Sequence, residues 1–369
     1  MGLSRGEFFS RIGMMREIDP LTTQAYRFAE KLEAEKPHIG AQAHAPWHVS
    51  FHGSQFPGDD PKACGRRAIY TMLDLPRGTF SRQSRQYMDA GKDLEMQLVR
   101  RWHQAGMLVS APPDSEHQTE FEDPEVWLTS TVDAILARPR SERTFVGEVK
   151  NVSADVMDKM IRLIRGPHEE YVRQVKCEIG LAHEHGPWTV KRCVNSGRIA
   201  VDVGTRRNGD GTGYVVTLCP EHGGDKCLEE VTLKPVEHGY LYYVSRDNPL
   251  DTREFYYEHD PAFMDAGRRQ LRVWRKFFEE GILPATQVTG KHPFGWNWTT
   301  DDSPCKWCPY GSTGSYVCKE DHLESVKRGE LLPLAESQAI EDAREARPEY
   351  DLGLIRAAVF ARWTAPEPN

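Results

Sequence analysis

The sequence lacks any apolar run close to the roughly 18 residues that a membrane-spanning helix needs, and its mean hydropathy is −0.61. The first twenty residues, MGLSRGEFFSRIGMMREIDP, lack the charged-then-apolar layout of a secretory signal. Internal repeats and long low-complexity segments are absent as well. These absences exclude an integral membrane protein and a repeat architecture, and they predict a cytoplasmic protein.

Positive charge is also in deficit. The 369 residues include 47 Lys and Arg against 55 Asp and Glu, a formal net charge of −8. A protein that coats nucleic acid over its whole surface carries the opposite balance. The composition therefore excludes broad electrostatic coating, but it leaves a local basic groove open.

Cysteine is present in eight copies, and hydrophobic residues make up 39% of the chain. In a reducing cytoplasm a disulfide framework is not expected, so metal binding is the favoured role for clustered cysteines. The apolar content and the length are sufficient for the core of one large domain or two ordinary ones.

Hydrophobic periodicity divides the chain into helical and extended segments. Helices are expected within 4–36, around 68–73, and over 89–104, 155–164, 169–183 and 262–280; strands are expected over 125–136, 144–152, 239–245 and 253–259. This order predicts an α/β fold with a central mixed sheet flanked by helices. We expect an N-terminal helical segment (1–45), a main domain (46–330) interrupted by a Gly- and Cys-rich insertion (186–236), and a charged helical tail (331–369).

The two central strands carry acidic and basic side chains within apolar runs. Glu148 and Lys150 are two residues apart, so they face the same side of a strand, and a hairpin brings Asp133 alongside them. Two carboxylates and an ammonium group on one face favour a Mg²⁺ or Mn²⁺ counter-ion. A metal-bound water beside a lysine is the minimum apparatus for attacking a phosphodiester. The alternative is an ordinary cross-strand ion pair on a solvated face.

The segments LTSTVDAIL and TFVGEVKN resemble the core of the PD-(D/E)XK nuclease superfamily, in particular its RecB-like exonuclease branch. That branch has a preceding Gly-x-x-x-His/Glu helix, which Gly91 to Glu95 match, although Glu95 also reads as a solvated helix residue beside Lys92. A later Gln-x-x-x-Tyr helix is matched at Gln174, with Glu178 in place of Tyr, and Ser130 stands where the family usually has Gly. The resemblance implies a catalytic set of Asp133, Glu148, Lys150, Glu95 and Gln174, with Glu95, Asp133 and Glu148 as the ligands of Mg²⁺ or Mn²⁺.

A second group of residues has metal-ligand spacing. Cys305 and Cys308 form a C-x2-C pair, and Cys318 follows ten residues later. Together with Cys64 they resemble the four cysteines of CRISPR-associated, phage-encoded and AddB-type nucleases, which hold a [4Fe–4S] cluster that ties the ends of the domain. Four thiolates could equally hold Zn²⁺, and the resemblance favours iron–sulfur. The resemblance implies that residues 46–330 form a nuclease domain with an iron–sulfur staple.

The insertion contains a third set, Cys193, Cys219, His222 and Cys227. Three cysteines and a histidine predict a structural zinc site in a segment that lacks a core of its own, and free thiols in a loop are an equal alternative. Cys177, inside an expected helix, is most simply a small buried residue.

Arginines interleaved with aromatic residues follow Cys64, and Arg66, Arg82 and Arg85 are the candidate DNA contacts. The sequence as a whole predicts a metal-dependent DNA exonuclease acting on single strands or duplex ends in phage-type recombination, replication or repair. Its partners would be DNA and recombination or replication proteins, with no membrane partner. The alternative is a non-catalytic DNA-end-binding or adaptor protein on a nuclease fold.

Overall fold

The computed structural model describes residues 50–60, 63–73, 75, 82–110, 119–164, 166–207, 213–284, 318, 321 and 331–364. The chain divides into the units Met1–Ala45 and Pro46–Asn369. The expected N-terminal helical segment (1–45) and the candidate cluster ligands Cys305 and Cys308 lie outside the described residues.

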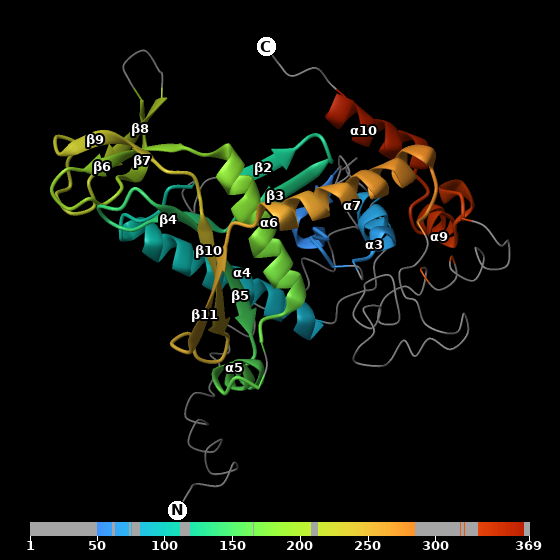
Figure 1. Cartoon of the computed structure of the whole chain (residues 1–369), viewed down its shortest axis with the longest axis horizontal. Coiled ribbons are helices and arrows are strands. Elements are labelled where there is room, and N and C mark those ends of the chain that lie inside the picture. The colour runs from blue at the N-terminus through green and yellow to red at the C-terminus, as the bar shows by residue number, and fades with distance from the viewer. Residues whose placement is uncertain are drawn as a thin grey trace, which may run out of the picture. The chain divides into compact units, whose positions relative to one another are not determined.

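The described elements alternate between helix and strand (Figure 1). In chain order they are β1 (Phe51–His52), η2 (Gly53–Gln55), α3 (Gly65–Met72), α4 (Arg82–Gln104), β2 (Glu120–Asp123), β3 (Leu128–Thr131), β4 (Ala134–Ala137), β5 (Thr144–Val152), α5 (Ala154–Ile161), α6 (Glu169–His185), β6 (Trp188–Cys193), β7 (Val201–Arg207), β8 (Gly213–Leu218), β9 (Leu228–Leu233), β10 (His238–Ser245), β11 (Thr252–Glu258), α7 (Pro261–Glu280), η3 (Leu334–Glu336), α9 (Gln338–Ala346) and α10 (Leu352–Thr364).

The central sheet has the strand order β11-β10-β5-β4. Strands β5 and β10 are parallel, whereas β4 and β11 run antiparallel to their neighbours, so the sheet is mixed as predicted. A Cβ on Gly147 would contact Trp102 of α4, whereas Glu148, on the opposite face of β5, bonds to Gln174 of α6. Helices therefore cover both faces of the sheet, and the prediction of a mixed α/β fold is confirmed.

The expected single strand 125–136 is wrong. The chain forms β3, which pairs with β1 and β2 in a separate three-stranded sheet, and then β4, which joins the central sheet. Asp133 lies at the bend between them, where its carboxylate Oδ2 accepts a hydrogen bond from the Val149 N–H at 2.7 Å. A side-chain bond thus replaces a strand-to-strand bond, and the strand breaks at the polar residue.

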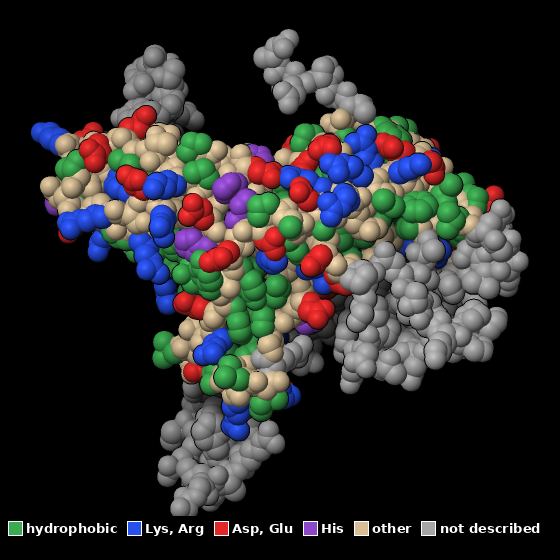
Figure 2. All heavy atoms as spheres, in the orientation of Figure 1, with side chains coloured by type: hydrophobic (Ala, Val, Ile, Leu, Met, Phe, Trp, Pro, Cys, Tyr) green, Lys and Arg blue, Asp and Glu red, His purple; other side chains and the backbone are tan. Residues whose placement is uncertain are grey.

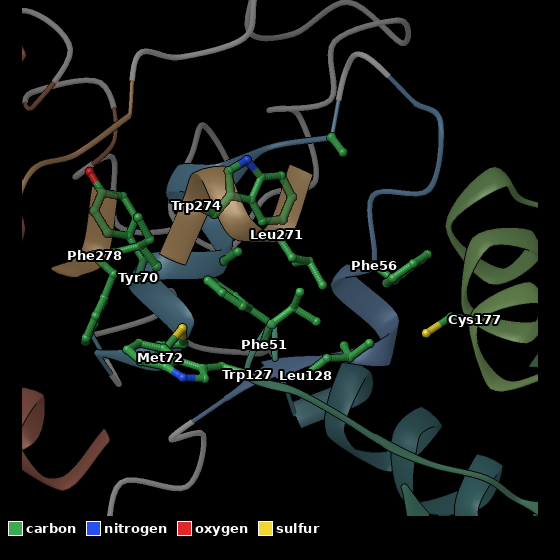
Figure 3. Close-up of a cluster of buried hydrophobic side chains, with 14 of the residues drawn as sticks. Phe51, Phe56, Tyr70, Met72, Trp127, Leu128, Cys177, Leu271, Trp274 and Phe278 are labelled. Atoms are coloured by element: carbon green, nitrogen blue, oxygen red, sulfur yellow. The ribbon is translucent and has the colours of Figure 1, made fainter. Parts of the chain in front are cut away.

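The main hydrophobic core joins the small sheet to α3, α7 and α10. Figure 3 shows Phe51 of β1 gathered with Trp274 and Trp127, and the Phe51 and Trp274 ring centroids are 6.0 Å apart. Trp127 lies edge-on to Phe278 of α7 and to Phe360 of α10, at 6.0 and 5.5 Å. Each such aromatic ring buries a large apolar area, so this cluster anchors segments from both ends of the described chain.

The predicted charged tail is packed against this core. Ala339, Ile340 and Ala343 of α9 and Val359 of α10 are fully buried. The Tyr350 hydroxyl donates to the Leu73 carbonyl at 3.0 Å, and Arg356 donates to the Phe278 carbonyl at the end of α7. The segment is helical as expected, but its helices contribute directly to the domain.

The insertion between α6 and β10 contains two antiparallel pairs, β6 with β9 and β7 with β8. No helix among the described residues has both the length and the apolar character to cross a membrane. On the face shown in Figure 2, basic and acidic side chains of the described residues are interspersed.

Candidate active site

The candidate catalytic residues meet where β4 and β5 part. Glu148 lies in the middle of β5 and is 1% exposed, and its Oε1 forms an ion pair with Lys150, two residues further along the strand. The prediction that both side chains share one face of the strand is confirmed. Because Glu148 is buried, the alternative of an ion pair on a solvated face is excluded.

Gln174 approaches Glu148 from α6. Its amide nitrogen donates to Glu148 Oε1 at 2.8 Å and to Glu178 Oε1 at 2.9 Å. Gln174 and Glu178 are four residues apart, so they lie on the same face of the helix. The amide holds two acidic side chains of different elements next to each other.

Glu95 reaches the cluster from α4, where its side chain is half-buried and lies close enough to the Asp133 carboxyl group to interact with it. The alternative of a solvated helix residue is therefore excluded. A Cβ on Gly91 would lie 3.5 Å from Cβ of Asn151, so α4 passes close to β5 one turn before Glu95. The Gly91–Glu95 spacing thus places a glycine against the strand and a carboxylate beside the cluster.

Sequence reasoning missed three neighbours of this site. Glu178 is fully buried, and among the described residues its Oε2 has no hydrogen-bond partner. Asn151 has both side-chain polar atoms buried and, within the same residues, unpartnered, and the ring of Tyr171 lies 5.0 Å from Lys150 Nζ. The signal for Glu178 was its i+4 spacing from Gln174 on a helix already assigned to the site.

Four carboxyl groups around one ammonium group perturb one another. Burial is the first cause that raises the pKa values of Glu95, Asp133 and Glu178 above the ordinary carboxyl range, and the charge of Glu148 is the second. Burial alone would lower the pKa of Lys150, but the carboxylates of Glu148 and Asp133 outweigh it and raise that pKa. The lysine is therefore held as a cation.

The residues fit a hard divalent metal ion. The carboxyl groups of Glu95 and Asp133 interact closely, and two carboxylates so near each other repel unless a proton or a cation lies between them. Glu148 Oε2 is buried, with no hydrogen-bond partner among the described residues. A cation binding these oxygens would offset the repulsion and satisfy the buried Glu148 oxygen, and carboxylate oxygens are the ligands that Mg²⁺ and Mn²⁺ prefer.

Two of the four candidate iron–sulfur ligands are described. Cys64 precedes the first residue of α3, and Cys318 is close enough to Tyr70 of the same helix for its charge to raise that side chain's pKa, after burial as the main cause. Cysteines from before and after the catalytic strands thus lie beside one helix. Cys305 and Cys308 lie outside the described residues.

Of the three arginines predicted to contact DNA, Arg66 is the one whose side chain the structure describes. Arg66 is 1% exposed, and its Nε donates to the Pro284 carbonyl at 2.6 Å, so the prediction that it contacts DNA is wrong. Its guanidinium group faces the interior beside Tyr70 and Asp321. The backbone of Arg82 and Arg85 forms the first turn of α4, and their side chains lie outside the described residues.

The cysteine and histidine residues of the insertion come together. The sulfur atoms of Cys193, Cys219 and Cys227 and a ring nitrogen of His222 all lie within 4.8 Å of one another.

A groove of about 690 Å³ lies at the start of β5 and β10, and none of the five candidate catalytic residues lines it.

No family model matches the sequence, and no curated protein matches it. Among solved structures, the chain is similar to the alkaline exonuclease LHK-Exo from Laribacter hongkongensis, with 11% identity and a TM-score of 0.37 over 63% of this chain and 89% of that chain. A structure of LHK-Exo in complex with dAMP gives 12% identity and a TM-score of 0.38, over 64% and 91% of the two chains. At these values the likeness is too distant to assign this chain to a family or an activity.

Proposed function

We propose that this protein is a Mg²⁺- or Mn²⁺-dependent nuclease that removes nucleotides from DNA ends or single strands. The observation that carries the proposal is the buried cluster of Glu95, Asp133, Glu148 and Lys150, drawn from a helix, a bend and a strand. Buried carboxylates with raised pKa values next to a lysine are typical of functional sites, because an ordinary structural ion pair does not gather like charges. The preference for DNA ends comes from the resemblance to RecB-like exonucleases.

Glu95, Asp133 and Glu148 would hold the metal ion, and a bound divalent ion supplies a Lewis acid and a water of lowered pKa. The Lys150 ammonium group, held charged by Glu148, would bind a non-bridging phosphate oxygen and stabilise negative charge as it develops. Gln174 would orient Glu148 through its hydrogen bond to Oε1. Glu178 occupies the position of the family's tyrosine and would set the charge of the cluster rather than contact the substrate.

Digestion of end-labelled linear DNA and of covalently closed single-stranded circles tests the proposal. With Mg²⁺ or Mn²⁺ present, we expect the linear strands to be degraded from an end and the circles to persist. Lys150→Met is expected to lower the rate about 10²-fold or more, because a charge that stabilises the transition state is lost.

Lys176→Met is the matched control. Lys176 lies on α6 and is 22% exposed, close to the 20% of Lys150, and it also forms an ion pair, with Asp260. The control is expected to cleave at the rate of the unchanged protein. Equal cleavage of circles would make the enzyme an endonuclease, and DNA binding without cleavage would favour the adaptor alternative.

We also propose that Cys64, Cys305, Cys308 and Cys318 hold a [4Fe–4S] cluster. Supporting this is the position of Cys64 and Cys318 beside α3, one on each side of the catalytic strands in sequence. Anaerobically purified protein would then be brown and contain iron, and Cys64→Ser would be colourless. Colourless unchanged protein that carries zinc on these cysteines would overturn the iron–sulfur assignment.

A further inference from the structure

The insertion contains a cluster of ligand atoms remote from the carboxylates. Nδ1 of His222 lies 3.5 Å from the sulfur of Cys193, 3.3 Å from that of Cys219 and 3.7 Å from that of Cys227. The cysteines are not in disulfides. One ring nitrogen is thus nearly equidistant from three sulfur atoms, and a disulfide would account for only two of the three.

These distances match a tetrahedral metal site. Zn²⁺ with bonds of about 2.3 Å to sulfur and about 2.1 Å to nitrogen holds each sulfur about 3.6 Å from the nitrogen. The three observed separations lie on both sides of that value. Three thiolates and one imidazole form a closed donor set that favours zinc over Mg²⁺ or Ca²⁺.

The backbone is arranged alike around two of the ligands. The N–H groups of Asn195 and Ser196 donate to the sulfur of Cys193, and those of Glu221 and His222 donate to the sulfur of Cys219. In both loops the donors are two and three residues after the cysteine. Hydrogen bonds of this kind orient a metal-binding sulfur, so the same outer shell is built twice.

A bound metal ion would stabilise an insertion that has little core of its own. The insertion consists of two separate two-stranded pairs, and isolated hairpins are marginally stable in water. Among the described residues, the buried apolar cluster of the insertion is small: Ile199 and Leu233 pack with Ala137 of β4, and the partly buried Trp188, Val190 and Val231 lie against them. Cys193 ends β6, and Cys227 directly precedes β9, so one ion bonded to both would clamp that pair at its end.

The loop after Cys193 contacts the turn between β4 and β5. Arg140 of that turn donates from its backbone to the Gly197 carbonyl at 3.2 Å and from its side chain to the Asn195 carbonyl at 2.6 Å. The Ile199 N–H donates to the carbonyl of Gly106, which follows α4, at 2.7 Å. Gly197 has φ +72, and a Cβ there would lie 2.4 Å from the Arg140 nitrogen, so the contact requires glycine.

We infer that Cys193, Cys219, His222 and Cys227 bind one Zn²⁺ ion, and that this ion holds the insertion against the β4–β5 turn. The Cys193 loop is shaped by the metal on one side and bonded to Arg140 on the other. Zinc therefore supports the end of the hairpin whose strands lead to the candidate active site. This inference does not depend on the proposed nuclease activity.

Metal analysis of the full-length protein, purified without chelator, tests the site. We expect about one zinc ion per chain, with at least about fivefold less in His222→Ala and Cys227→Ser. Both side chains are at least partly exposed, so neither substitution leaves a large cavity. Glu221→Gln, on the exposed neighbour of His222, and Cys177→Ala, in the core, are the controls and are expected to retain zinc.

Hydrogen exchange of the same proteins tests the link to the turn. The two variants that lose zinc should exchange faster at the amides of residues 138–143 and 194–199, while the amides of α6 stay protected. Unchanged protein without zinc, zinc retained by both variants, or iron in place of zinc on these ligands would overturn the site. Unchanged exchange at 138–143 after zinc loss would overturn the link.

Discussion

The position of the Glu178 carboxyl group in the fold disfavours its ionisation. Glu178 is fully buried, and its Oε1 accepts a hydrogen bond from Gln174, while the charges of Glu148 and Asp133 are close by. Burial and those charges raise the pKa of Glu178 well above the ordinary carboxyl value of about 4. The folded protein therefore binds a proton that the unfolded chain releases.

That difference predicts a pH dependence of stability. A carboxyl whose pKa is raised on folding stabilises the fold below its unfolded pKa, and this contribution is lost as pH rises through the folded pKa. In a buffer that contains a metal chelator, Glu178→Gln should match the unchanged protein in free energy of unfolding near pH 4 and exceed it at pH 8. Urea unfolding at several pH values measures this.

The control for this prediction is Glu169→Gln, which changes an exposed carboxylate at the start of the same helix. Its stability relative to the unchanged protein should not follow the same curve. A Glu178→Gln protein that loses stability at pH 8 would contradict the raised pKa.

At the scale of elements, substitution by alanine is expected to have opposite effects on stability at two helical glycines. A Cβ on Gly91 of α4 would meet only Asn151, at an ordinary 3.5 Å, whereas a Cβ on Gly267 of α7 would lie 2.1 Å from the buried ring of Phe56. Gly91→Ala should therefore stabilise the protein by about 0.5–1 kcal/mol through helix propensity. Gly267→Ala should destabilise it by about 1–3 kcal/mol through overpacking.

Thermal unfolding of the Gly91→Ala and Gly267→Ala proteins measures these two changes in stability. The Gly91→Ala protein should also keep the rate of the proposed nuclease reaction, because among the described residues the glycine's neighbour is the Asn151 side chain and no candidate catalytic group. Loss of stability in Gly91→Ala would mean that α4 lies closer to β5 than described.

Most of the segments that periodicity predicted match an element to within a few residues, and β5 over 144–152 coincides with the expected strand. It did not predict the break at Asp133, because an alternating pattern does not reveal that a side chain will take over a bond to Val149. Nor did it predict Glu178, whose importance depends on α6 facing Glu148. The local sequence pattern predicted the candidate ligand residues, whereas the crossover from β5 to β10 determines which further residues lie beside them.

At the scale of the whole molecule, α10 ties the end of the described chain to its centre. Phe360 lies against Trp127 and Phe278, and Leu354 on the same helix is 70% exposed. The segment LGLIRAAVFARWT is apolar around most of its circumference, so its sequence did not show which side is buried. The sequence predicted a charged helical tail over 331–369, and the contacts of α9 and α10 make these two helices part of the core.

Phe360→Ala should therefore lower the free energy of unfolding by about 1–3 kcal/mol, because two aromatic contacts and a partly buried ring are lost. Leu354→Ala, on the exposed side, should change it by no more than about 0.5 kcal/mol. Denaturant unfolding of the full-length variants measures both. Equal effects would show that α10 is not docked on Trp127.

The central claim is that the Glu95–Asp133–Glu148 cluster binds the metal ion that cleavage requires. Asp133→Asn tests it most directly, because the asparagine oxygen can still accept the hydrogen bond from Val149 while the metal-binding charge is removed. The measurement is the initial rate of degradation of end-labelled single-stranded DNA as Mg²⁺ is titrated. We expect a rate that rises to saturation in the unchanged protein and is at least about 10²-fold lower in Asp133→Asn at every Mg²⁺ concentration. Equal rates in the two proteins, or degradation by the unchanged protein in excess chelator, would contradict it.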